Sequence, residues 1–593
     1  MLDCIPFEGG TGVPPIPPPR GWKESFLARQ RCCIAIMHMA QAASEQLLPF
    51  LEALAGRIEK LWQQGEVRIG ERSILCEALL AVSVASDVAK QSEALAWTLA
   101  PVQAHWSEDG FQQSLQSPQH FFLAYMGIPG VAPGLVGGQE NRWVIYHEIV
   151  LIERSLRRLV EKSPADALHP FLSYYEWSLP WIVSLLRLIQ YCWTREGRQV
   201  LSQVAGALSM SKAERLSALG APTSTVSAAH REEDDERGAG GDTAYNLREF
   251  LRGSRECCFQ IIALTAGRLE GFFELRDMPS HLASSLVGNL HSMENRHLRM
   301  MIRTVFSVMC KKCPPQYNSE WLGPILPPLH LHMQQRLHAL WQACEARLDG
   351  NASGNTYEEG PSVENEVLEE RILRELTREY AGLLVQNIEQ GGKGANPAAG
   401  ARSMSDQTLD WMMVEHPNAV EAVLATCCSM LCWPDSEAAG KAVVFCRMIV
   451  CYADTDPRFY EIVGDILRAG LRALTVPSNS ALQAELLSLL RDIIMKTSQE
   501  RPLPLQILVT LPGVHEADVR NLLTSLHGTG SDKEQRVKLK QFLLSSGGEL
   551  LKAIPKPKSA PWGSLGGNKM GPTRKHEYQE VPDEDPAPLW FLT

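Results

Sequence analysis

The sequence lacks the features that mark membrane and secreted proteins. No apolar run reaches the ~20 residues that a membrane-spanning helix needs, because Arg, Glu or Pro interrupts each one. The start, MLDCIPFEGG, has no basic region followed by an apolar core, so no secretory signal is visible. We therefore expect a protein of the cell interior that does not insert into a membrane.

Cysteines in a disulfide or metal pattern are also missing. Several of the 15 cysteines are adjacent, as at Cys427-Cys428, which is typical of small buried side chains in a reducing compartment. Cys310 and Cys313 have the spacing of two metal ligands, but no second Cys or His pair lies nearby and prolines follow at once. The sequence therefore predicts neither a disulfide framework nor a metal site.

Catalytic signatures are absent as well. The chain contains no GxxxxGK[ST] loop, no GxSxG turn and no HExxH pair. The glycine-rich stretch GGKGANPAAG follows no strand pattern and lies in a low-complexity break, so it is predicted to be a linker. His330 and His332 are two residues apart on a predicted helix and diverge around it. We expect no catalytic residue, no cofactor and no enzymatic activity.

Positive charge is in deficit, with a net charge of -11. This balance argues against a protein that coats nucleic acid by bulk charge. It leaves open a local basic surface on an otherwise acidic body.

What the sequence does contain is one amphipathic helix after another. Apolar residues between Leu368 and Leu384 recur every three or four positions, as they do from Leu47 to Leu61. No long segment alternates as a strand would. Paired helices without a fixed motif suit HEAT-type repeats, whose period is ~40–47 residues. The predicted fold is all-α, a HEAT-type α-solenoid in which antiparallel helix pairs stack into a superhelical arch.

Segments of Pro, Gly and like charge interrupt the helices. Such composition predicts disorder. We expect a disordered leader at residues 1–22, a HEAT-repeat arch over residues 23–553, and a disordered tail at residues 554–593. Disordered inserts within the arch are expected near residues 217–244, 350–365 and 390–405.

Short motifs occur in a recognisable order along the chain. They include Cys313 to Pro315, Pro324 to Leu329, Leu331 to Met333, Leu368 to Glu370 and Leu376 to Glu379. Together with an Arg-x-Arg-Cys helix near the start and the final helices, they resemble the C-terminal half of the exportin-5 family in its plant, HASTY-type form. The family's N-terminal half, which carries its main repeats for the GTPase Ran, has no counterpart here.

The resemblance implies a nuclear export receptor of the karyopherin class. Its expected partners are double-stranded or hairpin RNA such as microRNA precursors, Ran in its GTP state, and nuclear pore proteins. It would shuttle between nucleus and cytoplasm and serve RNA silencing, with Ran binding weakened or lost without the N-terminal repeats. The alternative is a HEAT scaffold that binds proteins without RNA or Ran.

RNA binding in such a family uses phosphates and duplex shape more than base edges. Basic residues on helices that match the family are therefore the candidate RNA-binding residues, although for any one of them alone an ordinary solvated residue is the more common case. The candidates are Arg29, Arg31, Arg299, Arg303, Lys533, Arg536, Lys538 and Lys540.

Overall fold

The computed structural model describes most of the chain, and its regular structure there is helical. The described residues are 22–128, 138–160, 170–229, 243–269, 271–351, 363–389, 408–452, 460–497, 503–511, 513–528 and 530–546. No strand occurs in these ranges, so the predicted all-α class is confirmed. The described helices fall into two compact units, the first ending at Glu294 and the second beginning at Asn295.

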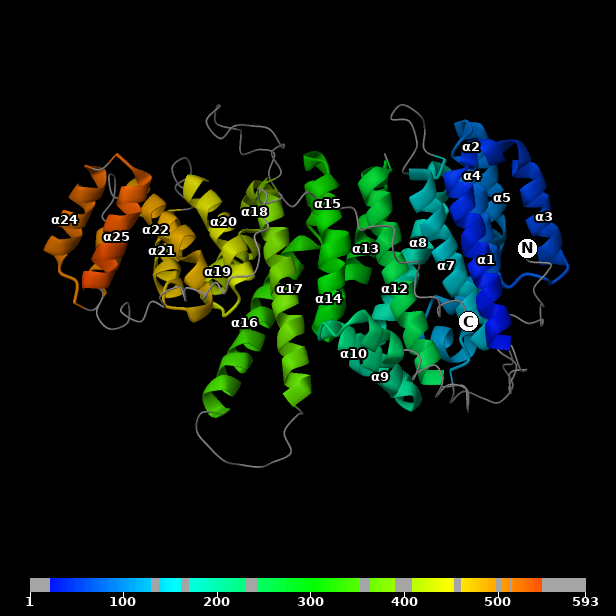
Figure 1. The fold of residues 1–593 in the computed structure, drawn as a ribbon, viewed down its shortest axis with the longest axis horizontal. Coiled ribbons are helices and arrows are strands. Elements are labelled where there is room, and N and C mark those ends of the chain that lie inside the picture. The colour runs from blue at the N-terminus through cyan, green and yellow to red at the C-terminus, as the bar shows by residue number, and fades with distance from the viewer. Residues whose placement is uncertain are drawn as a thin grey trace, which may run out of the picture. The chain divides into compact units, whose positions relative to one another are not determined.

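The first unit is built on a row of long helices that pack side by side (Figure 1). The row is formed by α1 (Trp22–Ala42), α4 (Ile69–Ser83), α7 (Gly138–Val160) and α12 (Thr243–Arg268). Partner helices cover it: α3 (Leu51–Gln63) and α5 (Val88–Trp106) pack on α4, α8 (Leu172–Tyr191) packs on α12, and α13 (Met278–Val287) packs on α8. Each helix thus meets a sequence neighbour and the next helix of its row.

The second unit repeats this arrangement with two rows. The α17 row consists of α14 (Asn295–Met301) continued by α15 (Ser307–Lys312), then α17 (Val363–Glu389), α20 (Ser436–Tyr452), α22 (Gln483–Thr497) and α25 (Asp532–Ser546). The α19 row consists of α16 (Leu326–Asn351), α19 (Pro417–Cys432), α21 (Tyr460–Ala473), α23 (Leu503–Leu508) and α24 (Glu516–His527). α18 (Thr408–Glu415) precedes α19.

Successive helices of the α17 row run in the same direction. Arg299 pairs with Glu375 while Ser307, further along, bonds to Gln386 of the same neighbour. Parallel neighbours require the chain to return through the other row each time, as it does in stacked helical hairpins. The fold is therefore a HEAT-type α-solenoid, as predicted. α25 is an exception, because Arg536 meets Ser488 and Lys540 meets Gln483, so it runs antiparallel to α22.

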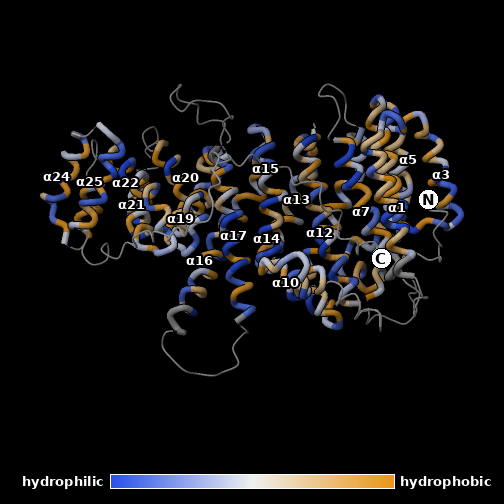
Figure 2. The backbone as a smooth tube through the Cα atoms, viewed as in Figure 1, coloured by the Kyte–Doolittle hydropathy of each residue, from blue (hydrophilic) through white to orange (hydrophobic). Residues whose placement is uncertain are grey.

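Amphipathic spacing accounts for the packing of these helices. In α17 the predicted stripe is buried at Leu368, Leu376, Tyr380, Leu383 and Leu384. Figure 2 shows the matching alternation of hydrophobic and hydrophilic residues along the helices. Burying a Leu-sized side chain contributes roughly 1.5–3 kcal/mol, so stripes of this kind supply most of the stabilisation between neighbouring helices.

The stripe from Leu47 to Leu61 does not form one continuous helix. α2 (Ser44–Leu47) gives way to a 3₁₀ turn at Leu48–Phe50 before α3 begins. Pro49 lies in that turn, where its missing N–H ends the regular ladder. Of the stripe, Ile58 and Leu61 are buried.

Several predicted disordered segments lie mainly outside the described residues. These are the leader up to residue 21, the segments 352–362 and 390–407, and everything after residue 546. The insert expected near 217–244 is described in part, since α10 (Lys212–Ala218) enters it and residues 223–229 are helical, whereas residues 230–242 lie outside. Within the described ranges, no helix combines the length and the hydropathy needed to cross a bilayer.

Candidate nucleic-acid interface

The first candidate, Arg29, lies between α1 and α4. Its Nε and Nη2 donate to the two carboxylate oxygens of Glu71, each at 2.9 Å, and Nη2 also donates to the carbonyl of Glu66 at 2.7 Å. The side chains of Arg29 and Glu71 are only 3% and 4% exposed. A two-point guanidinium–carboxylate pair at this depth ties the two helices together. A phosphate cannot reach Arg29 here, so Arg29 has a structural role and does not belong to the proposed RNA-binding surface.

Arg31 lies two residues further along α1 and points elsewhere, because residues two apart do not share a helix face. It is exposed, and no carboxylate of the described residues pairs with it. Of the two candidates on α1, only Arg31 is accessible to a ligand.

Arg299 and Arg303 belong to an unusually basic segment. We call residues 295–312 the basic helix, since all of its Lys, Arg, Asp and Glu positions are basic: Arg296, Arg299, Arg303, Lys311 and Lys312. Arg299 is half-buried and pairs with Glu375 of α17. Arg303 is exposed, and no ion pair joins it to another described residue. The structure thus places these two candidates on one helix, where Arg299 is held by an ion pair and Arg303 is exposed to solvent.

The four candidates on α25 point in different directions. Arg536 donates to Ser488 Oγ at 3.2 Å and Lys540 to Gln483 Oε1 at 2.7 Å, both toward α22. Lys538 donates to the carbonyl of Ser525 at 3.3 Å, toward α24. Lys533 is exposed near the start of the helix. These contacts divide the group between two neighbouring helices, so it does not form one patch.

Sequence reasoning missed Lys311 and Lys312, which are exposed at the end of the basic helix. The signal that could have found them is the Lys-Lys pair between Cys310 and Cys313, at the end of a segment without acidic residues. Both cysteines are buried, and burial raises the pKa of the Cys313 thiol to about 12, so it stays protonated near neutral pH. No cluster of His, Cys, Asp or Glu suited to a metal ion occurs in the part of the chain that the structure describes.

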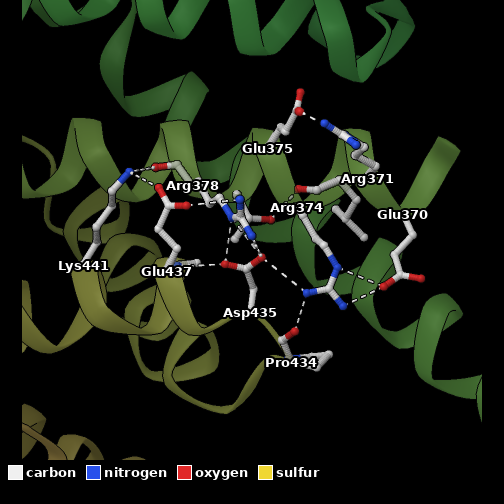
Figure 3. Close-up of polar contacts among 12 residues, drawn as sticks. Glu370, Arg371, Arg374, Glu375, Arg378, Pro434, Asp435, Glu437 and Lys441 are labelled. Carbon is white, nitrogen blue, oxygen red and sulfur yellow. Dashed lines mark hydrogen bonds and ion pairs between the residues drawn. The ribbon is translucent and has the colours of Figure 1, made fainter. Parts of the chain in front are cut away.

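A second basic group lies where α17 meets α20, and Figure 3 shows it in detail. We call it the α17–α20 junction. Asp435 has a fully buried side chain and accepts from Arg378 Nε at 3.0 Å to each carboxylate oxygen. Arg374 pairs with the same carboxylate at 3.4 Å and with Glu370 at 2.6 Å. Glu437 adds pairs to Arg378 at 3.1 Å and Lys441 at 3.4 Å.

Asp435 also begins α20, since its Oδ1 accepts from the N–H of Ala438 at 2.9 Å. Burial alone would raise the pKa of Asp435, but the hydrogen bonds from Arg378 and Ala438 and the charge of Arg374 lower it below the ordinary value. Arg378 in turn has a raised pKa because Asp435 accepts its hydrogen bonds. Arg374 and Arg378 therefore join two repeats through one buried carboxylate.

Comparison with known proteins gives consistent matches along the chain. The sequence model of the family described as the Exportin-5 family matches residues 21–558 of this chain. Protein HASTY 1 of Arabidopsis thaliana is 28% identical, over 93% of this chain and 48% of its own length. Exportin-5 of Dictyostelium discoideum is 21% identical over 92% of this chain and 46% of its own, and Exportin-5 of Homo sapiens is 24% identical over 69% and 37%. The chain spans less than half the length of each of these relatives.

Proposed function

The chain belongs to the Exportin-5 family, and on that basis we propose that it forms part of a nuclear export receptor for structured RNA. Its cargo would be double-stranded or hairpin RNA such as microRNA precursors. It would act as a binding receptor rather than an enzyme, and it would move between nucleus and cytoplasm in the service of RNA silencing.

The observation that carries the RNA assignment is the charge of the basic helix. The chain as a whole has a net charge of -11, yet residues 295–312 include no acidic residue. Exposed cations attract phosphates, and releasing the counterions of a nucleic acid drives such binding. A-form RNA presents its phosphates and 2′-hydroxyls while its deep major groove hides the bases, so a basic helix surface suits it.

Ran in its GTP state is the proposed second partner, and nuclear pore proteins are a third. Family membership supports both. The titration below measures whether Ran in its GTP state tightens RNA binding by this chain.

A protein-binding HEAT scaffold is the competing function. The acidic net charge favours it, as does the neutralisation of most basic side chains at the α17–α20 junction. The two functions differ in how binding depends on salt.

A titration of fluorescent hairpin RNA with a two-nucleotide 3′ overhang into the purified chain separates them. It is run at several salt concentrations, with and without GTP-loaded Ran, and a single-stranded RNA of equal length is the control. We expect hairpin affinity to fall steeply with salt, by a log–log slope of roughly 0.7–0.9 per phosphate contact. Binding tightened by Ran supports a coupled receptor, and binding indifferent to Ran supports an RNA-binding wall alone. No hairpin binding at low salt would leave only the scaffold.

A further inference from the structure

The basic helix is not a regular α-helix. A π-turn at Ile302–Phe306 separates α14 from α15. A π-turn accommodates one extra residue in a helix and is frequent at functional sites. Its effect here is to change which side chains share a face.

Four positions spaced by four residues cross this turn: Arg299, Arg303, Ser307 and Lys311. In a regular α-helix each residue rotates by about 100°, so Lys311 would lie about 120° around the axis from Arg299. One extra residue in the π-turn absorbs about 100° of that rotation and leaves about 20°. The four side chains therefore form a nearly straight row along the helix, about 18 Å long at 1.5 Å per residue. We call it the cation row.

Contacts and burial agree with this geometry. Arg299 and Ser307 both bond to α17, through Glu375 and Gln386. Arg303 and Lys311 are exposed, whereas Leu298, Ile302, Phe306 and Met309 of the same helix are buried. The cation row thus runs along the edge of the basic helix beside α17, facing away from the core.

Gln386 holds the helix directly after the π-turn. Its Oε1 accepts from Ser307 Oγ at 2.7 Å and its Nε2 donates to the Ser307 carbonyl at 2.6 Å. A side chain that bonds both to a helix carbonyl and to the adjacent hydroxyl fixes the local backbone. Gln386 is therefore a positioning residue for the part of the row that follows the π-turn, Ser307 and Lys311.

We propose that the cation row binds the phosphodiester backbone of duplex RNA along its length, with Arg303 and Lys311 as the outer contacts and Arg299, shared with Glu375, as the inner one. This rests on the proposed function and adds the contacting residues and their geometry. A straight row of about 18 Å matches a polymer whose charges repeat at short, regular intervals, on the order of one per 3.4 Å of each strand in a duplex. A folded acidic protein surface has no such repeat.

The decisive variant exchanges two neighbouring residues, Arg303→Thr with Thr304→Arg. Composition and net charge stay the same, but the guanidinium moves about 100° off the row. Hairpin binding is measured against salt for this exchange, for Arg303→Gln, for Lys311→Gln, and for Lys60→Gln on α3 as a control at an exposed lysine elsewhere. We expect the exchange and both row substitutions to weaken binding about fivefold and to reduce the salt slope by about 1, and the control to leave both unchanged.

The outcomes separate this inference from the function on which it rests. If the natural chain binds the hairpin and the exchange binds equally well, bulk charge suffices and the row is wrong while the function stands. If the natural chain binds no hairpin, both fail. If poly-glutamate displaces the hairpin at matched charge concentration, the assignment to duplex RNA is wrong.

Circular dichroism melting checks that each variant folds. Thr304 is half-buried, so the exchange could disturb packing. Should it melt early, the double variant Arg303→Gln with Lys311→Gln, at two exposed positions, takes its place. An unchanged salt slope in that double variant would overturn the proposal.

Discussion

The basic helix and the α17–α20 junction are neighbours in the second unit, and both are rich in arginine. At the junction, Asp435, Glu370 and Glu437 balance the guanidinium groups within 3.4 Å. On the basic helix, Arg299 pairs with Glu375, whereas Arg303 is exposed and joins no ion pair with another described residue. The same side chain therefore joins repeats in one place and is available to a ligand in the other. We therefore expect local charge balance, more than the number of arginines, to mark the proposed binding surface.

The largest effect is expected at the junction. Asp435→Ala removes the carboxylate that Arg374 and Arg378 share and the cap of α20, which should destabilise the fold by about 3 kcal/mol. Urea or thermal unfolding measures this. Asp465→Ala, which removes an exposed partner of Arg468, is the control and should cost less than about 1 kcal/mol. Equal unfolding curves for the two variants would show that the junction is not a structural tie.

Low pH should reduce the difference in free energy of unfolding between the natural chain and Asp435→Ala. The folded-state pKa of Asp435 is lowered, below an unfolded value of about 3.9. Its stabilisation is thus fully present above about pH 4 and is lost as pH falls through the lower folded value. Unfolding of the natural chain and of Asp435→Ala, compared from pH 7 to pH 3, should show a constant gap that narrows only at the acidic end. A gap that narrows between pH 7 and pH 5 would contradict the assignment.

Removing an acidic partner of the basic helix should make the helix bind RNA more tightly. Glu375→Gln removes the carboxylate that pairs with Arg299 and with Arg371 and leaves an amide of similar size. If the basic helix binds RNA, hairpin affinity should rise by about threefold at low salt, since the Arg299 guanidinium becomes available to a phosphate. Glu421→Gln on α19 removes an exposed charge from the other row and is the matched control. An equal gain in both variants would indicate a general charge effect.

The smallest effect on the stability of the fold is expected at Arg303, the exposed arginine of the basic helix. Arg303→Gln breaks no ion pair with a described residue, so its free energy of unfolding should stay within about 0.5 kcal/mol of the natural chain. The same variant should lose RNA affinity, which separates binding from folding. Clear destabilisation would mean that Arg303 supports the fold, as Arg29 does.

Much of the architecture followed from the sequence, because helical periodicity is local. Spacings of three and four residues in α17 predicted the buried stripe, and the order of short motifs predicted the family that the comparisons confirm. The break at Leu48–Phe50 was missed although Pro49 signalled it. The helical spacing of apolar residues continues from Leu47 to Leu61 across the turn, so the spacing alone predicted one continuous helix.

The candidate site could be predicted only in part, because accessibility depends on neighbours far away in the sequence. Arg29 and Arg31 are both arginines of the same helix, and nothing in the local sequence distinguishes them. In the fold, Arg29 is buried and pairs with Glu71, 42 residues away in the sequence, whereas Arg31 is exposed. The π-turn that brings Arg299 and Lys311 onto one row was not predicted, and Gln386, which bonds to Ser307 directly after the turn, lies 79 residues away in the sequence. The sequence by itself determined helices, repeats and family through local spacing and motif order. Tertiary structure alone decided which cations are neutralised and which stay accessible, since charge pairing and burial are set by residues that meet only in the fold.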